Sequence, residues 1–121
     1  MTDKPRYTFH YTPAPYFDSL DPAEDYVPAE YAEEGFIHCT DGAANMANTA
    51  NRHFGRDPRD FWALYIDKEQ VRSPIKYEDP REIYPHIYGP LNRDAIVRTL
   101  PALRAEDGTF LAMPEIDGRD A

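Results

Sequence analysis

Three of the four histidines lie in short apolar segments bounded by turn residues, where a solvated imidazole is uncommon. The three are His10, His38 and His86, within residues 7–12, 35–40 and 85–91. A buried imidazole without a hydrogen-bond partner costs roughly 1–3 kcal/mol, so each ring needs either a partner or a chemical role. The pattern therefore predicts a histidine-lined cleft that binds a small ligand.

Other chemistry for these residues stays open at this point. Three imidazoles can hold a catalytic zinc ion, which makes a metal-dependent hydrolase one alternative. Each ring can instead donate to a backbone carbonyl and stiffen the core. Cys39 follows His38, but neighbours on a strand point to opposite faces, so we expect a buried structural thiol. Glu78 ends a predicted strand on the face of Lys76 and serves either as an acid–base group or in an ion pair.

Two arginines are candidate ligands for a small anion. Arg52 lies beside His53 on a predicted helix, and Arg6 lies beside the first predicted strand. Asn48 and Asn51 share the helix of Arg52 and face either a cleft or solvent. No glycine-rich phosphate loop, Gly-x-Ser-x-Gly elbow or paired-cysteine zinc motif is present.

The net charge and the composition limit the classes of partner that we expect for the chain. Its 121 residues carry a formal net charge of −9, which repels a long nucleic acid or an anionic membrane. No run approaches the ~20 apolar residues of a membrane span, and residues 1–5 do not resemble a signal peptide. The single cysteine excludes an internal disulfide and favours a cytoplasmic location. No feature specifies an oligomeric state.

Hydrophobic periodicity predicts one α+β domain over residues 1–121, with a mixed or mostly antiparallel sheet and a few short helices. The apolar run 61–66 is the candidate central strand, buried on both faces. Asp107-Gly108 predicts a hairpin, and residues 114–121 are expected to fray. The other predicted strands are 6–12, 36–39, 75–78 and 83–88, and the predicted helices are 29–34, 41–54 and a turn at 93–97. Gly35 is expected to end the helix 29–34. Thr40 or Asp41 is expected to cap the helix 41–54 and Gly55 to end that helix. Asn92 is expected to cap the turn at 93–97.

The motifs together resemble the family called domain of unknown function 952. Members carry an early histidine and threonine, the motif Glu-Gly-Phe-Ile-His-Cys-Ser/Thr, a helix with Ala-Asn, and Pro-His-Ile/Val-Tyr-Gly-Pro-Leu. Here these are His10 with Thr12, residues 34–40, Ala50-Asn51, and residues 85–91. The likeness covers roughly residues 6–100. It excludes the proline-rich segment 13–28 and the C-terminal hairpin.

This resemblance implies a fold similar to that of ADP-ribosyltransferases, a split α+β sheet around an NAD-binding cleft. In transferases of that fold, a first-strand histidine holds the nicotinamide ribose, a role that falls to His10. A late strand supplies a glutamate that stabilises the oxocarbenium-like transition state, and His86 falls near that position here. RNA 2′-phosphotransferases have a similar fold without that glutamate and grip phosphate with histidine and arginine, for which this chain offers His38 and Arg52.

We therefore expect a transferase that acts on NAD or a related nucleotide. A non-catalytic module that binds a nucleotide or another small ligand, and the metal-dependent hydrolase, are the alternatives. The expected catalytic residues are His10, His38, His86 and Glu78. The expected ligand-binding residues are His10, Thr12, His38, Thr40, Asn51, Arg52 and Tyr88.

Overall fold

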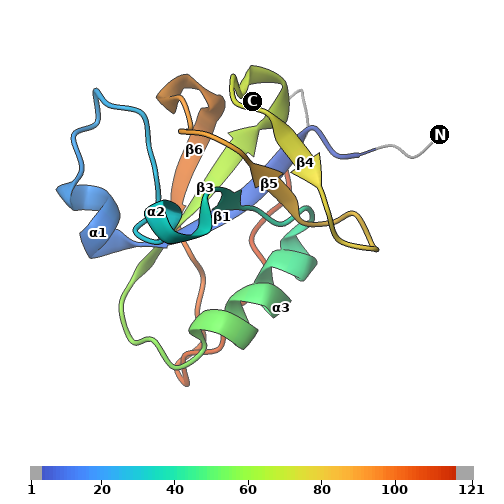
Figure 1. Ribbon diagram of the computed structural model, residues 1–121. Coiled ribbons are helices and arrows are strands. Elements are labelled where there is room, and N and C mark those ends of the chain that lie inside the picture. The colour runs from blue at the N-terminus through green and yellow to red at the C-terminus, as the bar shows by residue number, and fades with distance from the viewer. Residues whose placement is uncertain (1–3, 117–121) are drawn as a thin grey trace.

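The computed structural model describes residues 4–116 as an α+β domain (Figure 1). Its strands are β1 (Tyr7–Pro13), β2 (Ile37–His38), β3 (Phe61–Asp67), β4 (Ile75–Tyr77), β5 (Pro85–Ile87) and β6 (Ile96–Pro101). Its helices are α1 (Ala14–Ser19), α2 (Tyr31–Glu34) and α3 (Ala43–Phe54), with 3-10 turns at Lys68–Gln70 and Arg93–Ala95. The strands form two antiparallel three-stranded sheets in the orders β1-β3-β6 and β2-β5-β4. The predicted α+β class, with antiparallel sheets and a few short helices, is thus confirmed.

Strand β3 lies in the middle of the first sheet and has apolar neighbours on both faces, as its sequence predicts. Ala63 and Tyr65 belong to the core between this sheet and α3. Leu64 and Ile66 belong to a second core, which the other sheet covers. A strand buried on both faces needs a continuous apolar run, because either face would otherwise place a polar group in a core.

The two sheets meet where β1 passes the end of β2. Phe9 and Thr40 exchange both backbone hydrogen bonds there, Phe9 N–H to Thr40 O at 3.0 Å and Thr40 N–H to Phe9 O at 2.9 Å. We call this the seam. It fixes the position of β2, which is only two residues long, against the seven-residue strand β1. The side chains that follow β2 are therefore held by the first sheet.

Helix α3 lies beside the strands in Figure 1 and packs its small residues against β1 and β3. It ends at Phe54, just before Gly55, as predicted, but the predicted cap is wrong. Gly42 is the N-cap residue, neither Thr40 nor Asp41 caps with its side chain, and Glu115 accepts the N–H of Ala43 at 2.7 Å. No helix among residues 4–116 is long and apolar enough to cross a membrane.

The helical turn predicted over 93–97 is too long, because strand β6 begins at Ile96. The 3-10 turn stops at Ala95, and the chain then runs along β3 with a bulge between Tyr65 and Ile66. Asn92 is the N-cap residue of the turn, as predicted, but its side chain makes no capping bond and instead bonds the backbones of Gln70 and Arg72. Residues 98 and 99 are polar and exposed, so this edge strand lacks the apolar signal of a buried one.

The C-terminal region folds back on the first core. The predicted hairpin is present as an antiparallel bridge between Arg104 and Phe110, with Gly108 at φ +94° in the turn. Residues 114–116, at the start of the segment expected to fray, contact the domain: Pro114 O accepts from Tyr65, Glu115 bonds Ala43, and Ile116 packs on the core. Residues 117–121 lie outside the described residues.

The cap that Glu115 provides can be tested by stability. Glu115→Ala removes a carboxylate that bonds the N-terminal end of α3, and we expect a loss of about 1 kcal/mol in the free energy of unfolding. Urea denaturation of both proteins measures it. Glu106→Ala, at an exposed position in the hairpin, is the matched control and should stay within about 0.5 kcal/mol of the parent. Equal losses in the two variants would contradict the capping role.

Candidate functional site

A cleft of about 660 Å³ opens between the second sheet, α3 and the segment before α2. All four histidines line it, so the predicted histidine-lined cleft is present. His38 comes from β2, His86 from the neighbouring strand β5, and His53 from the end of α3. In the register of the second sheet His38 lies directly opposite His86. Residues opposite each other on adjacent strands point to the same face, which brings the two rings together.

Each of the two paired histidines lies beside its own glutamate, His86 in a hydrogen bond and His38 in an ion-pair contact. His38 Nε2 lies 3.1 Å from Glu34 Oε1, and His86 Nδ1 lies 3.2 Å from Glu78 Oε1. The ring centroids of the two histidines are 5.2 Å apart. We call these pairs the Glu34–His38 and Glu78–His86 dyads. All four of their residues line the cleft.

The dyads fix which nitrogen of each ring is available. A carboxylate accepts hydrogen bonds, so the hydrogen bond of His86 to Glu78 requires a proton on Nδ1, and the ion-pair contact of His38 with Glu34 favours a proton on Nε2. The other nitrogen, Nδ1 of His38 or Nε2 of His86, then holds the lone pair, and no hydrogen-bond partner for it is present within residues 4–116. An imidazole oriented in this way can take a proton, or give one once it is protonated.

Aromatic side chains pack around the dyads. Phe36 stacks on His86, with centroids 4.1 Å apart and planes at 21°, and also contacts His38 and Tyr88. The hydroxyl of Tyr88 donates to Glu78, and this bond together with that of His86 holds the pKa of Glu78 below its ordinary value. His86 is consequently less exposed than His38, with 17% against 55% of the side chain accessible.

His10 has a different position from the one expected of a catalytic or ribose-binding group. Its Nδ1 lies 2.6 Å from the carbonyl of His38, which requires that Nδ1 donates, and its Nε2 accepts from the hydroxyl of Tyr26 at 2.8 Å. Both nitrogens are therefore occupied within the protein. Burial lowers the pKa of His10 to about 4, so the ring is neutral near pH 7. His10 holds the backbone of His38, and we correct its role from catalysis to positioning.

The expected ligand-binding residues divide into two groups. Thr12, Thr40 and Arg52 line the cleft, together with His10 and His38. Asn51 does not, because its amide bonds both backbone groups of Phe110 and serves the hairpin instead. Tyr88 lies outside the lining and acts on Glu78.

Arg52 is the cleft arginine that is available to an anion. It donates to the hydroxyl of Tyr84 at 3.1 Å, which lowers the pKa of Tyr84, and it has no carboxylate partner among residues 4–116. Arg59, the other arginine of the cleft, is bound by Asp57 through several hydrogen bonds. Arg6, the second predicted anion ligand, forms a two-bond contact with Asp67 and lies away from this cleft.

Sequence reasoning missed Glu34, Tyr26 and Tyr84. Glu34 carries a detectable signal, because it precedes His38 by four residues and Gly35 ends α2 between them with φ +80°. That turn is what brings the carboxylate back onto the ring. Tyr26 and Tyr84 come from irregular segments, where no periodicity predicts the direction of a side chain.

The junction between β2 and α3 is fixed by a buried polar cluster. Asp41 accepts from Lys68 and from the hydroxyl of Tyr77, and Lys68 also contacts Tyr77. This explains why Asp41 is not the cap of α3: its carboxylate is bound elsewhere. Burial raises the pKa of the neighbouring Cys39 thiol well above its ordinary value, which agrees with the predicted structural thiol.

The three predicted histidines do not form a metal site. Within residues 4–116 no three His, Cys, Asp or Glu side chains are grouped so that they could hold a metal ion. Both nitrogens of His10 are already bonded, so this ring has no lone pair for a metal. The hydrolase alternative therefore lacks its third ligand.

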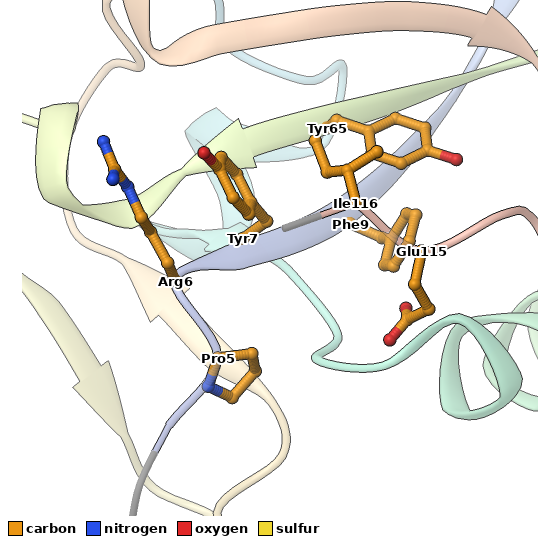
Figure 2. A pocket seen from close by; sticks show the side chains of 7 residues that line it. All are labelled: Pro5, Arg6, Tyr7, Phe9, Tyr65, Glu115 and Ile116. Atoms are coloured by element: carbon orange, nitrogen blue, oxygen red, sulfur yellow. The ribbon is translucent and has the colours of Figure 1, made fainter. Parts of the chain in front are cut away.

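A second, smaller cavity of about 240 Å³ lies on the other face of β1 (Figure 2). Tyr7, Phe9 and Tyr65 form its walls with Ile116, and Glu115 extends from it toward α3. No histidine lines it, and Arg6 at its rim is bonded to Asp67. The chemistry predicted from the sequence thus belongs to the larger cleft.

Comparison with known proteins identifies the family. Residues 11–99 match the model of the family described as Protein of unknown function (DUF952). The chain belongs to this family. The matched segment includes both dyads and begins directly after His10. A search of curated proteins finds no match to this DUF952 domain.

The DUF952 domain also resembles solved structures of protein CC0527 from Caulobacter crescentus. A crystal structure superposes with a TM-score of 0.73 at 19% identity and covers 87% of this chain and 93% of that chain. The solution NMR structure superposes with a TM-score of 0.66 at 20% identity and covers 85% of this chain and 90% of that chain. At this identity the likeness defines the fold alone. The relation to ADP-ribosyltransferases stays a prediction.

The buried His10 predicts an acid-sensitive stability. Because burial lowers its pKa from 6.5 to about 4, the unfolded chain takes up this proton first as the pH falls. The neutral ring therefore contributes to the free energy of unfolding above pH 6.5, and this contribution is lost as the pH falls from 6.5 to 4. A pKa difference of one unit corresponds to about 1.36 kcal/mol, so the expected loss is roughly 3 kcal/mol. His10→Gln should lack that part of the decline when urea unfolding is measured at several pH values. Parallel declines in both proteins would contradict the assignment.

Proposed function

We propose that this domain binds a small nucleotide, NAD or a related one, in the histidine cleft and catalyses transfer of a group from it. The observation that carries the proposal is the pair of adjacent dyads. Two imidazoles, each oriented by a carboxylate and each with one available nitrogen, are the equipment of acid–base catalysis. A purely structural histidine has no need of an exposed nitrogen.

The dimensions and polar groups of the cleft support a ligand of nucleotide size. A volume of about 660 Å³ falls within the usual range of ligand pockets, about 300–1,000 Å³. Arg52 supplies a cation for a phosphate, since its guanidinium can bond two phosphate oxygens at once.

The roles follow from the contacts. His38 and His86 exchange protons with the substrate, while Glu34 and Glu78 orient their rings. His10 orients His38, and Thr12 and Thr40 line the cleft. The expected likeness to ADP-ribosyltransferases agrees with a nucleotide ligand but is an analogy of fold, which does not by itself assign a function. The buried, unpaired thiol of Cys39 suits a reducing compartment such as the cytoplasm.

Thermal unfolding with added NAD, ADP-ribose and ATP tests the binding. A nucleotide at about 100 times its dissociation constant should stabilise the folded protein by roughly 2.7 kcal/mol and raise the Tm by several degrees. Chromatography of the incubated nucleotide then tests for turnover. Binding without turnover would support a non-catalytic nucleotide-binding module, and no shift with any nucleotide would overturn the proposal.

Arg52→Ala tests the anion contact. Loss of a charge-assisted bond to phosphate should weaken nucleotide binding by at least about tenfold, since such bonds contribute about 1.5–3 kcal/mol. Arg56→Ala, which removes an exposed arginine just beyond α3 and outside the cleft lining, is the matched control. Calorimetric titration of both variants measures the effect. Equal affinities in the two variants would exclude Arg52 as the phosphate contact.

A further inference from the structure

The presence of two dyads rather than one restricts the bond that the site can cleave. Each dyad presents one nitrogen that can take or give a proton, so the site has the groups to exchange two protons in one reaction. A substrate that uses both must release a proton from its nucleophile and require another at its leaving group. This requirement distinguishes between the classes of nucleotide that the cleft could use as a substrate.

Cleavage of the nicotinamide–ribose bond of NAD does not use both dyads. Nicotinamide leaves as a neutral base and takes no proton, so one dyad would have no task. That reaction instead needs a carboxylate beside the oxocarbenium-like transition state. Three of the carboxylates that line the cleft are engaged: Glu34 pairs with His38, Glu78 bonds His86 and Tyr88, and Asp79 accepts from the backbone of the segment before β5. The fourth, Glu30, lies away from the two paired strands, in the segment before α2.

Hydrolysis of a phosphodiester uses both dyads. The attacking water must lose a proton as it bonds to phosphorus, and the departing ribose oxygen is a poor leaving group unless it receives one. Two imidazoles with centroids 5.2 Å apart are close enough to reach oxygens of a single phosphate bound beside them. A phosphodiester carries one negative charge, which suits a cleft with one available arginine in a chain of net charge −9.

We infer that the substrate is a nucleoside phosphodiester with a single negative charge, such as a 2′,3′-cyclic nucleotide, an inference that rests on the nucleotide binding proposed above. One imidazole takes a proton from water at its free nitrogen while the water oxygen bonds to phosphorus. The bond from phosphorus to the ribose oxygen breaks, and the other imidazole gives its proton to that oxygen. The product is a nucleoside monophosphate. The imidazoles have then exchanged protonation states, which solvent restores.

Hydrolysis of 2′,3′-cyclic AMP by the purified protein, followed by chromatography of 2′- and 3′-AMP, tests this inference. His38→Gln and His86→Gln should each lower kcat at least about 100-fold, the usual contribution of an acid–base group. Glu34→Gln keeps the shape of the side chain and disturbs only the orientation of His38. It should lower kcat by roughly 10–100-fold, in the range typical of groups that orient a reactive side chain, and leave KM within about twofold.

Glu33→Gln is the matched control, because Glu33 neighbours Glu34 on the exposed side of α2 and does not line the cleft. Its kcat should equal that of the parent. Circular dichroism confirms that each variant is folded, and the surface variant Glu34→Gln keeps the test valid if a histidine variant unfolds.

Two results separate this inference from the proposal beneath it. If nucleotides raise the Tm but 2′,3′-cyclic AMP is not hydrolysed, or is hydrolysed equally by the parent, His86→Gln and Glu34→Gln, the phosphodiester inference is wrong and nucleotide binding stands. If neither NAD, ADP-ribose nor 2′,3′-cyclic AMP changes the Tm and none is turned over, both are wrong.

Discussion

The seam between the two sheets is the constraint on which the site depends. Strand β2 has only two residues and could not hold a side chain in place by itself. Three hydrogen bonds from β1 fix the segment: the two backbone bonds of Phe9 with Thr40, and the bond from His10 to the carbonyl of His38. Since β3 pairs along the whole of β1, the most deeply buried strand of the domain supports the position of His38.

The histidines thus divide their work according to burial. His10 lies inside the seam and stays neutral, and both of its ring nitrogens form hydrogen bonds within the protein. His38 and His86 lie at the surface of the second sheet, where one nitrogen of each stays available. Burying a charged imidazole is costly, so a residue that must change its protonation state is better placed at the cleft than in the core. The same residue type therefore serves two roles, chosen by position.

Much of the fold and part of the site could be predicted from the sequence. Local patterns sufficed for β1, β3, α3 and the hairpin, because each carries its own periodicity or turn residues. Strand β6 was missed because an exposed edge strand has a weak apolar pattern, and the cap from Glu115 was missed because 72 residues separate it from Ala43. The apolar surroundings of the histidines suggested a cleft, but their convergence could not be predicted, because it depends on the pairing of β2 with β5, nearly 50 residues apart in the chain. The bonds of Asn51 to Phe110 and of Arg6 to Asp67 depend on tertiary contacts, which residue type alone does not define.

The central claim is that His38 and His86 are each oriented by their own glutamate. The tautomers of the neutral rings, measured by long-range ¹H–¹⁵N correlation spectra above pH 8, test it most directly. The account predicts opposite tautomers: a proton on Nε2 of His38, facing Glu34, and on Nδ1 of His86, facing Glu78. The same tautomer on both rings, or rapid exchange between the two tautomers on either, would contradict the account.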